Sequence, residues 1–179
     1  TNNKNRYKLV NPVAIDIGAD ILHDTPLTTS RNIKGAGITV AVVDSGIYFD
    51  SEVKSTLGGR IVQQFLGQAD YVTPICVTKP DGTLAGVQNA GYCLITPNNR
   101  DYSRDGYGHG THVAGTIWSN LIDDDTNVMM GIAPDANILS VRVLDDDGYG
   151  SYETVIKGIQ FVVANKSAYN VRVMNLSLS

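Results

Sequence analysis

The chain has 179 residues, of which 42% are hydrophobic and 18 are glycine, so it can bury a core in one globular domain and is not expected to be disordered. Its formal net charge of -4 supplies no basic patch for a phosphate backbone, and we expect no nucleic-acid partner. No apolar run approaches the roughly 20 residues of a membrane helix, and the polar residues 1–4 do not form the apolar part of a secretory signal. We therefore expect no membrane partner.

The first strong pattern is a strand at residues 37–44. This short apolar run is rich in β-branched residues, as in strands buried on both faces, and Asp44 ends it. From about residue 66 to residue 104 turn signals dominate, and we interpret 66–104 as an insertion on the surface. A disulfide between Cys76 and Cys93 in this insertion would restrain the unfolded chain by about 2–4 kcal/mol; two free thiols are the alternative.

Helices and strands alternate in the rest of the chain. Residues 109–122 place apolar side chains at three-and-four spacing, as an amphipathic helix does, and residues 152–165 repeat this pattern. Residues 137–144 and 170–178 repeat the buried-strand pattern. The alternation predicts an α/β fold with a three-layer, doubly wound parallel sheet. No repeat or linker divides the chain, so one domain is expected.

Two motifs contain side chains that could take part in catalysis. They are residues 40–47, Val-Ala-Val-Val-Asp-Ser-Gly-Ile, and residues 105–116, Asp-Gly-Tyr-Gly-His-Gly-Thr-His-Val-Ala-Gly-Thr. Asp44 and His109 stand where the carboxyl end of a strand meets a helix N-terminus, the usual place for chemistry in open α/β sheets. Such an aspartate can accept the histidine Nδ1 hydrogen, so that Nε2 can take a proton from a serine hydroxyl. Taken alone, Asp44 also fits a solvated turn carboxylate.

Together the two motifs resemble the aspartate and histidine motifs of subtilisin-like serine proteases, the subtilase family. The resemblance implies that residues 1–179 are the N-terminal portion of a single catalytic domain with a subtilisin-like fold, incomplete in this chain. It implies an extracellular, secreted serine endopeptidase acting on proteins or peptides, with catalytic residues in the chain order Asp, His, Ser. Asp44 would orient His109, which would act as general base and then general acid. The second histidine of the motif, His112, is expected to be a packing residue.

A substrate cleft also follows from the resemblance. Residues 148–150, Gly-Tyr-Gly, and 177–179, Ser-Leu-Ser, resemble two segments that present backbone to an extended peptide. The family usually has Gly where this chain has Ser179, and a larger residue there is expected to narrow the primary specificity pocket. The residues expected to line the cleft are Leu144, Gly148, Tyr149, Gly150, Tyr152, Val155, Ser177, Leu178 and Ser179. Core packing is the alternative for its apolar members, Leu144, Tyr152, Val155 and Leu178.

Two acidic clusters, residues 123–125 and 145–147, supply oxygen atoms of the kind that calcium prefers. The first falls in a loop where members of the family bind calcium, so Asp125, Asn127 and Glu52 are candidate ligands of a structural calcium ion. A solvated turn is the alternative there, and it is our interpretation of the second cluster. We expect no catalytic metal.

No serine of this chain lies in the Gly-Thr-Ser-Met context that the family uses for its nucleophile. We therefore expect a second polypeptide that carries the rest of the catalytic domain with the serine. One alternative is a catalytically inactive binding module on the subtilase fold, or an inert fragment. Another is a metal hydrolase using His109 and His112, which would need a third ligand.

Overall fold

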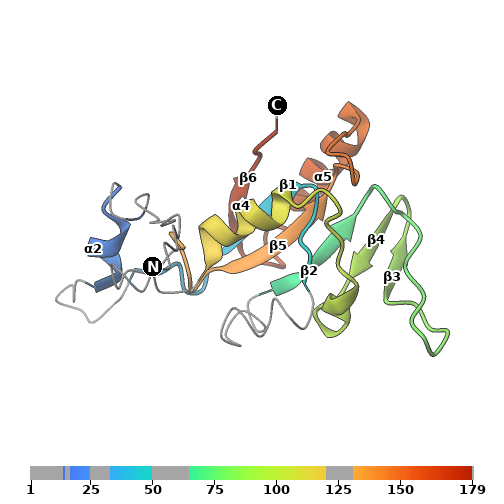
Figure 1. The fold of residues 1–179 in the computed structure, drawn as a ribbon, viewed down its shortest axis with the longest axis horizontal. Helices are drawn as coiled ribbons and strands as arrows, with labels where there is room; N and C mark the ends of the chain where they lie inside the picture. Colours follow the sequence, from blue (N-terminus) through green and yellow to red (C-terminus); the bar gives the residue numbers. More distant parts are fainter. Residues whose placement is uncertain (1–13, 15–16, 25–32, 50–64, 120–130, 179) are drawn as a thin grey trace, which may run out of the picture.

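The computed structural model describes residues 14, 17–24, 33–49, 65–119 and 131–178. The strands in this part are β1 (Thr39–Asp44), β2 (Phe65–Asp70), β3 (Gly86–Asn89), β4 (Tyr92–Ile95), β5 (Asn137–Arg142) and β6 (Val171–Asn175). The helices in this part are α2 (Ala19–Asp24), the 3-10 helix η2 (Pro97–Tyr102), α4 (His109–Trp118) and α5 (Tyr152–Asn165). These described strands form one sheet in the order β3-β4-β2-β5-β1-β6 (Figure 1).

The sheet has a parallel part that carries the candidate site. Strands β2, β5, β1 and β6 run parallel. Strand β5 lies between β1 and β2; its pairing with β1 has no register shift, and its pairing with β2 has one between Phe65 and Gly67. Asp44 and Asp70 both lie opposite Arg142, so three charged residues end neighbouring strands at the same edge. The predicted strands are confirmed as β1, β5 and β6. Strands β3 and β4 are antiparallel, so the sheet is mixed, where an all-parallel sheet was expected.

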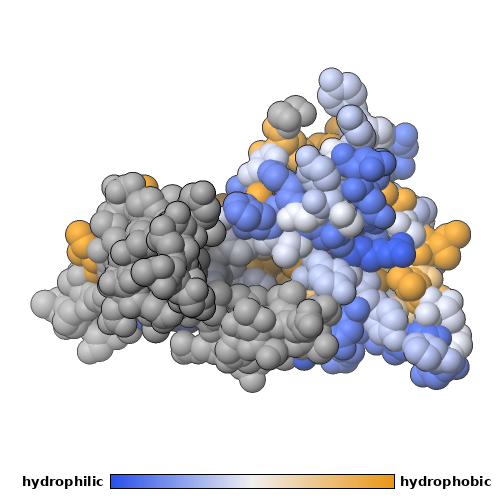
Figure 2. Space-filling view, viewed as in Figure 1, coloured by the Kyte–Doolittle hydropathy of each residue, from blue (hydrophilic) through white to orange (hydrophobic). Residues whose placement is uncertain are grey.

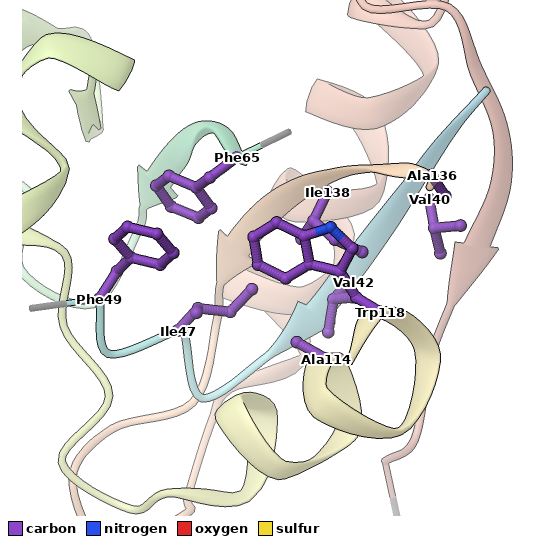
Figure 3. Packing of buried hydrophobic residues seen from close by; sticks show 9 residues of the cluster. All are labelled: Val40, Val42, Ile47, Phe49, Phe65, Ala114, Trp118, Ala136 and Ile138. Carbon is purple, nitrogen blue, oxygen red and sulfur yellow. The ribbon is translucent and has the colours of Figure 1, made fainter. Parts of the chain in front are cut away.

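Helices α4 and α5 cover opposite faces of the sheet, which makes three layers and confirms the doubly wound arrangement. Side chains along a strand alternate between its faces. On β1, Val42 packs with Trp118 of α4, while Val43 packs with Phe161 of α5. Figure 3 shows the α4 side, where the rings of Phe49 and Trp118 lie beside the sheet with centroids 6.2 Å apart. Burying each large apolar side chain stabilises the fold by about 1.5–3 kcal/mol.

Part of the segment predicted as a surface insertion, residues 66–104, lies inside the sheet. Strand β2 runs between β4 and β5 and is almost entirely buried. The sequence pattern missed this strand because buried polar residues, Gln68 and Asp70, interrupt its apolar residues. The remaining part forms the β3–β4 ribbon and η2, at the end of the sheet opposite β6 (Figure 1).

A disulfide joins Cys76 to Cys93 of β4, with Cα atoms 5.2 Å apart, so the structure contains the bridge and not two free thiols. Both cysteines are buried against Ile95. None of the described helices combines the length and apolar character needed to cross a membrane. The face of the molecule in Figure 2 is largely hydrophilic where the structure is described, with separate hydrophobic patches between the polar side chains.

Candidate active site

Asp44 and His109, far apart in the sequence, meet at the carboxyl edge of the parallel strands. Asp44 ends β1 with its side chain 0% exposed, and its Oδ1 accepts a hydrogen bond from the Ser45 backbone amide at 2.7 Å. His109 is the first residue of α4, and its Nδ1 lies 2.9 Å and 3.0 Å from the two carboxylate oxygens of Asp44. The imidazole is 41% exposed. With Nδ1–H donating to Asp44, Nε2 on the other side of the ring is free to accept a proton.

The two loops approach closely because glycines stand at the contact. A Cβ atom at Gly110 would overlap the carbonyl oxygen of Gly46 and lie 3.2 Å from the Asp44 Cβ. Gly46 itself has a φ of +108°, and a Cβ there would overlap the Arg104 carbonyl oxygen. Side chains at either position would push α4 away from β1 and separate His109 from Asp44.

Asp105 and Ser45 fix the start of α4. The Asp105 carboxylate accepts hydrogen bonds at 2.8 Å from the Ser45 hydroxyl and from the amides of Gly108 and Thr111, and it also accepts one from the Thr111 hydroxyl. The Ser45 hydroxyl oxygen in turn accepts a hydrogen bond from the Gly110 amide at 2.9 Å. We did not single out Asp105 from the sequence, although an acidic residue just before a helix is a recognised N-terminal signal.

Gln68 of β2 is a second positioning residue that the sequence pattern did not reveal. Its Oε1 accepts hydrogen bonds at 2.8 Å from the Ile47 amide and the Ser140 hydroxyl, and its Nε2 donates to the Arg104 carbonyl at 3.0 Å. It therefore joins the loop after Asp44 to the loop before His109. A buried side-chain amide with three hydrogen bonds of this kind holds its partners in one arrangement.

A cleft of about 540 Å³ opens beside His109. Its lining includes eight of the nine predicted cleft residues: Leu144, Gly148, Tyr149, Gly150, Tyr152, Val155, Ser177 and Leu178. The ninth, Ser179, lies outside the described residues. Leu144 and Val155 also pack against the core cluster on the α5 side of the sheet, so they combine both roles that the sequence left open. The cleft is therefore assembled from the segment after β5, helix α5, the segment after β6, and the start of α4 with the loop before it.

Tyr107 is a lining residue that we did not predict. Its ring lies over Gly148, where a Cβ atom would be 2.7 Å from the tyrosine Cζ. The ring centroid is 6.2 Å from that of His109. Tyr107 thus connects the loop just before His109, here called the histidine loop, to the segment of residues 148–150.

The sequence profile described as the subtilase family matches residues 35–179, which contain both motifs and every residue that lines the cleft. The chain belongs to the subtilase family. This confirms the resemblance seen in the two motifs. Neither the match nor the geometry assigns a role to each cleft residue, and those roles stay predictions.

Relatives of this subtilase chain include three named proteases. Subtilisin E of Bacillus subtilis (strain 168) is 31% identical over 153 residues, 86% of this chain and 30% of the relative. The Major intracellular serine protease of the same strain is 32% identical, over 86% of this chain and 37% of the relative. Alkaline serine exoprotease A of Vibrio alginolyticus is 33% identical, over 82% of this chain and 20% of the relative. The chain thus spans well under half the length of each.

Among solved structures, a cold adapted subtilisin-like serine proteinase is 29% identical, with a TM-score of 0.46. The match covers 83% of this chain and 41% of that protein.

The prediction that His112 packs in the subtilase core is wrong. Helix α4 turns Gly110, Ala114 and Trp118 toward the sheet, and this leaves His112 exposed on the outer side. Among the residues that the structure describes, no group of three or more His, Cys, Asp or Glu side chains could hold a metal ion. The metal-hydrolase alternative therefore gains no third ligand there.

Of the two acidic clusters, the structure describes only the second, residues 145–147. Asp125, Asn127 and Glu52 lie outside the described residues, so calcium binding by them stays a prediction. In the second cluster, Asp145 closes a turn, since its Oδ1 accepts hydrogen bonds from the amides of Asp147 at 3.0 Å and Tyr149 at 2.8 Å. Asp146 forms an ion pair with Arg142.

Proposed function

We propose that this chain supplies the aspartate and the histidine of an Asp-His-Ser triad in a serine endopeptidase that cleaves proteins or peptides. The observation that carries the proposal is the contact between His109 Nδ1 and the fully buried Asp44 carboxylate at 2.9 Å, beside a cleft that His109 itself lines. This geometry holds one histidine tautomer and orients the ring.

In this mechanism Nε2 of His109 takes the proton of a serine hydroxyl as the serine oxygen attacks the peptide carbonyl carbon. Asp44 stabilises the imidazolium that forms and remains ionised. His109 then gives the proton to the departing amine, and water, activated in the same way, releases the acyl group from the serine. The backbone of the Gly148–Gly150 segment would pair with the substrate as an added strand.

We propose that a serine outside residues 1–179, in the rest of the subtilase domain, completes the triad. The serines near the site are engaged in structural bonds: Ser45 bridges Asp105 and Gly110, and Ser177 donates to the Asn175 side-chain oxygen at 2.9 Å. Ser151 lines the cleft and caps α5 by accepting from the Thr154 amide at 3.1 Å. None of the three stands in the sequence context of a subtilase nucleophile.

We also propose that the protein is secreted. The buried Cys76–Cys93 disulfide supports this, because structural disulfides persist mainly in oxidising compartments outside the cytosol. The names of the relatives include one exoprotease and one intracellular protease, so family membership alone does not assign the compartment.

The test is labelling of the native protein with a fluorophosphonate, which modifies activated serines, followed by intact-mass analysis of each polypeptide. We expect the label on a serine outside residues 1–179. His109→Ala should lower kcat by on the order of 10⁶-fold and Asp44→Asn by about 10⁴-fold, magnitudes known for the corresponding losses in subtilisin and other triad proteases.

His112→Ala is the matched control, because it removes an exposed histidine from the same helix and should leave labelling unchanged. A native sample in which no polypeptide is labelled would overturn the proposal in favour of an inactive binding module on the same fold.

A further inference from the structure

Arg142 is a buried charge beneath the active site that the proposed mechanism does not use. It ends β5, and its side chain is 2% exposed. The guanidinium donates from each of its nitrogens, to groups on three separate segments of the chain: Ser45, Asp70 with Thr73, and Asp146. A planar fork of donors suits such simultaneous contacts better than the single ammonium of lysine does.

One contact reaches the turn that follows the catalytic aspartate. Arg142 Nε donates to the Ser45 carbonyl oxygen at 3.1 Å. The arginine stem also packs under Gly46, where a Cβ atom would lie 3.0 Å from Arg142 Cδ. Ser45 and Gly46 are the residues against which the start of α4 rests. Arg142 therefore supports the backbone that sets the distance between Asp44 and His109.

The second contact reaches the cleft. Arg142 Nη2 donates to Asp146 Oδ1 at 2.7 Å, although the Asp146 side chain is 73% exposed. Asp146 also fills the space beside Gly106, where a Cβ atom would be 2.7 Å from the Asp146 Cβ. Asp146 thus ties the turn at residues 145–147, which leads into the Gly148–Gly150 segment, both to the buried arginine and to the histidine loop.

Asp70 neutralises the arginine independently of Asp146. Arg142 Nη1 lies 3.2 Å and 3.0 Å from the two Asp70 oxygens, and Asp70 is itself buried and accepts from the amides of Val72 and Thr73. Loss of Asp146 would therefore leave no unpaired buried charge, whereas loss of Asp70 would. The arginine therefore does not need Asp146 to neutralise its buried charge, and the Asp146 contact can serve another role.

We infer that Arg142 is a positioning residue that holds the catalytic Asp44–Gly46 turn and the cleft segment Gly148–Gly150 in one fixed relation, the latter through Asp146. The inference rests on the proposed function and adds to it. The Asp146 contact governs how well the cleft accepts peptide, and the Ser45 contact governs the geometry of the catalytic pair.

The test compares Asp146→Ala with Asp147→Ala in the full-length protein, using an uncharged extended peptide substrate. Both variants remove one carboxylate from the same exposed turn, but only Asp146 contacts Arg142. We expect Asp146→Ala to raise KM about 10-fold, the size of one lost charge-assisted hydrogen bond, with kcat within about twofold of the parent. Asp146→Asn, which keeps an acceptor oxygen, should give an intermediate KM. Asp147→Ala should match the parent.

Arg142→Lys tests the second contact, because it keeps the charge but cannot donate to all three segments. We expect kcat to fall about 10-fold as well as KM to rise. Equal kinetics for Asp146→Ala and Asp147→Ala, or a loss of thermal stability with KM unchanged, would overturn the inference.

Hydrogen exchange separates this inference from the proposed function. The amides of Asp147 and Tyr149 should exchange faster in Asp146→Ala and Arg142→Lys than in the parent or in Asp147→Ala. If the parent protein is not labelled by fluorophosphonate but exchange shows this pattern, the anchoring stands and the protease proposal fails. Unchanged exchange would refute the anchoring whatever the activity.

Discussion

Four residues before His109, the Asp105 carboxylate gathers the donors that hold the first turn of α4. Its Oδ1 accepts from the Ser45 hydroxyl and the Gly108 amide, and its Oδ2 accepts from the Thr111 amide. These amides belong to the group at a helix N-terminus that no carbonyl of the helix can satisfy. A carboxylate is suited to this place because both of its oxygens accept and its charge is favourable at that end of the helix.

Asp105→Asn should therefore reduce both stability and activity. One side of an amide can only donate, so at least one of the amides or hydroxyls that Asp105 satisfies would lose its acceptor. We expect the free energy of unfolding to fall by about 1–3 kcal/mol. We also expect kcat to fall because His109 lies in the turn that loosens. Urea unfolding and peptide hydrolysis measure the two effects.

Asp147→Asn makes the same chemical change at an exposed carboxylate. It should alter neither stability nor kcat. An equal loss in both variants would mean that net charge, and not the hydrogen bonds of Asp105, is responsible.

At the scale of elements, helix α4 shows how two glycines of one helix serve different purposes. Gly110 is buried at the contact with Gly46, and a Cβ atom there would overlap the Gly46 carbonyl oxygen. Around Gly115, five residues later, a Cβ atom would meet nothing within 4 Å. Gly110 permits the close approach of α4 to β1, whereas at Gly115 a Cβ atom would meet no neighbouring atom.

Alanine at these two positions should have opposite effects. Gly115→Ala should raise the free energy of unfolding by about 0.5–1 kcal/mol, because alanine loses less backbone entropy in a helix than glycine does. Gly110→Ala should lower it by about 1–3 kcal/mol, the usual range for overpacking, and should lower kcat by separating His109 from Asp44. Thermal unfolding of the two variants in parallel measures the difference. Destabilisation by Gly115→Ala, or tolerance of Gly110→Ala, would contradict this account of the helix.

The strands show when an apolar sequence pattern is sufficient to predict a buried strand. Strand β1 is apolar without a break from Val40 to Val43, and β5 keeps its apolar pattern around one internal polar residue, Ser140, so the sequence predicts both. For most of β2, which is equally buried, the sequence predicts a surface insertion instead, because Gln68 and Asp70 break the apolar pattern. A buried polar residue is stable only with partners, and those partners lie on β5 and on loops that the local pattern does not reveal.

At the scale of the whole molecule, an aromatic cluster joins the outer ribbon to the α5 layer. Tyr71, just after β2, stacks on Tyr92 of β4 with ring centroids 4.9 Å apart. Tyr92 meets Phe161 of α5 edge to face at 5.3 Å. The cluster therefore connects three parts of the fold. Burial, followed by the nearby Tyr92, raises the pKa of Tyr71 from its ordinary value of 10.0 to about 12.

This raised pKa predicts how stability depends on alkaline pH. The pKa of Tyr71 is higher in the folded than in the unfolded protein, so its contribution to stability is complete below pH 10 and is lost as the pH rises from about 10 through about 12. Tyr71→Phe cannot ionise. The difference in unfolding free energy between parent and variant should be constant below pH 10 and shift in favour of the variant above it.

Ultraviolet titration of tyrosinate checks the assignment, because Tyr71→Phe should lose one late-titrating step. Tyr169, whose pKa burial also raises, should still titrate late in that variant. A lost step centred near pH 10 would show that Tyr71 is not protected in the folded state.

The sequence by itself determined which residues the site proposal rests on and the type of fold, because each motif, and each strand or helix, is a pattern of residues close together in the chain. The motifs around Asp44 and His109 contain the proposed catalytic pair and the glycines that let the two loops meet. Tertiary structure decided which polar residues hold the pair in place. Gln68 bonds to groups 21 and 72 residues away, and Arg142 bonds to Asp70, 72 residues away. Tertiary structure also decided that His112 faces outward, because the sheet lies against the other side of α4, which carries Gly110, Ala114 and Trp118. Contacts of this kind are set by the packing of distant segments, so local patterns do not show them.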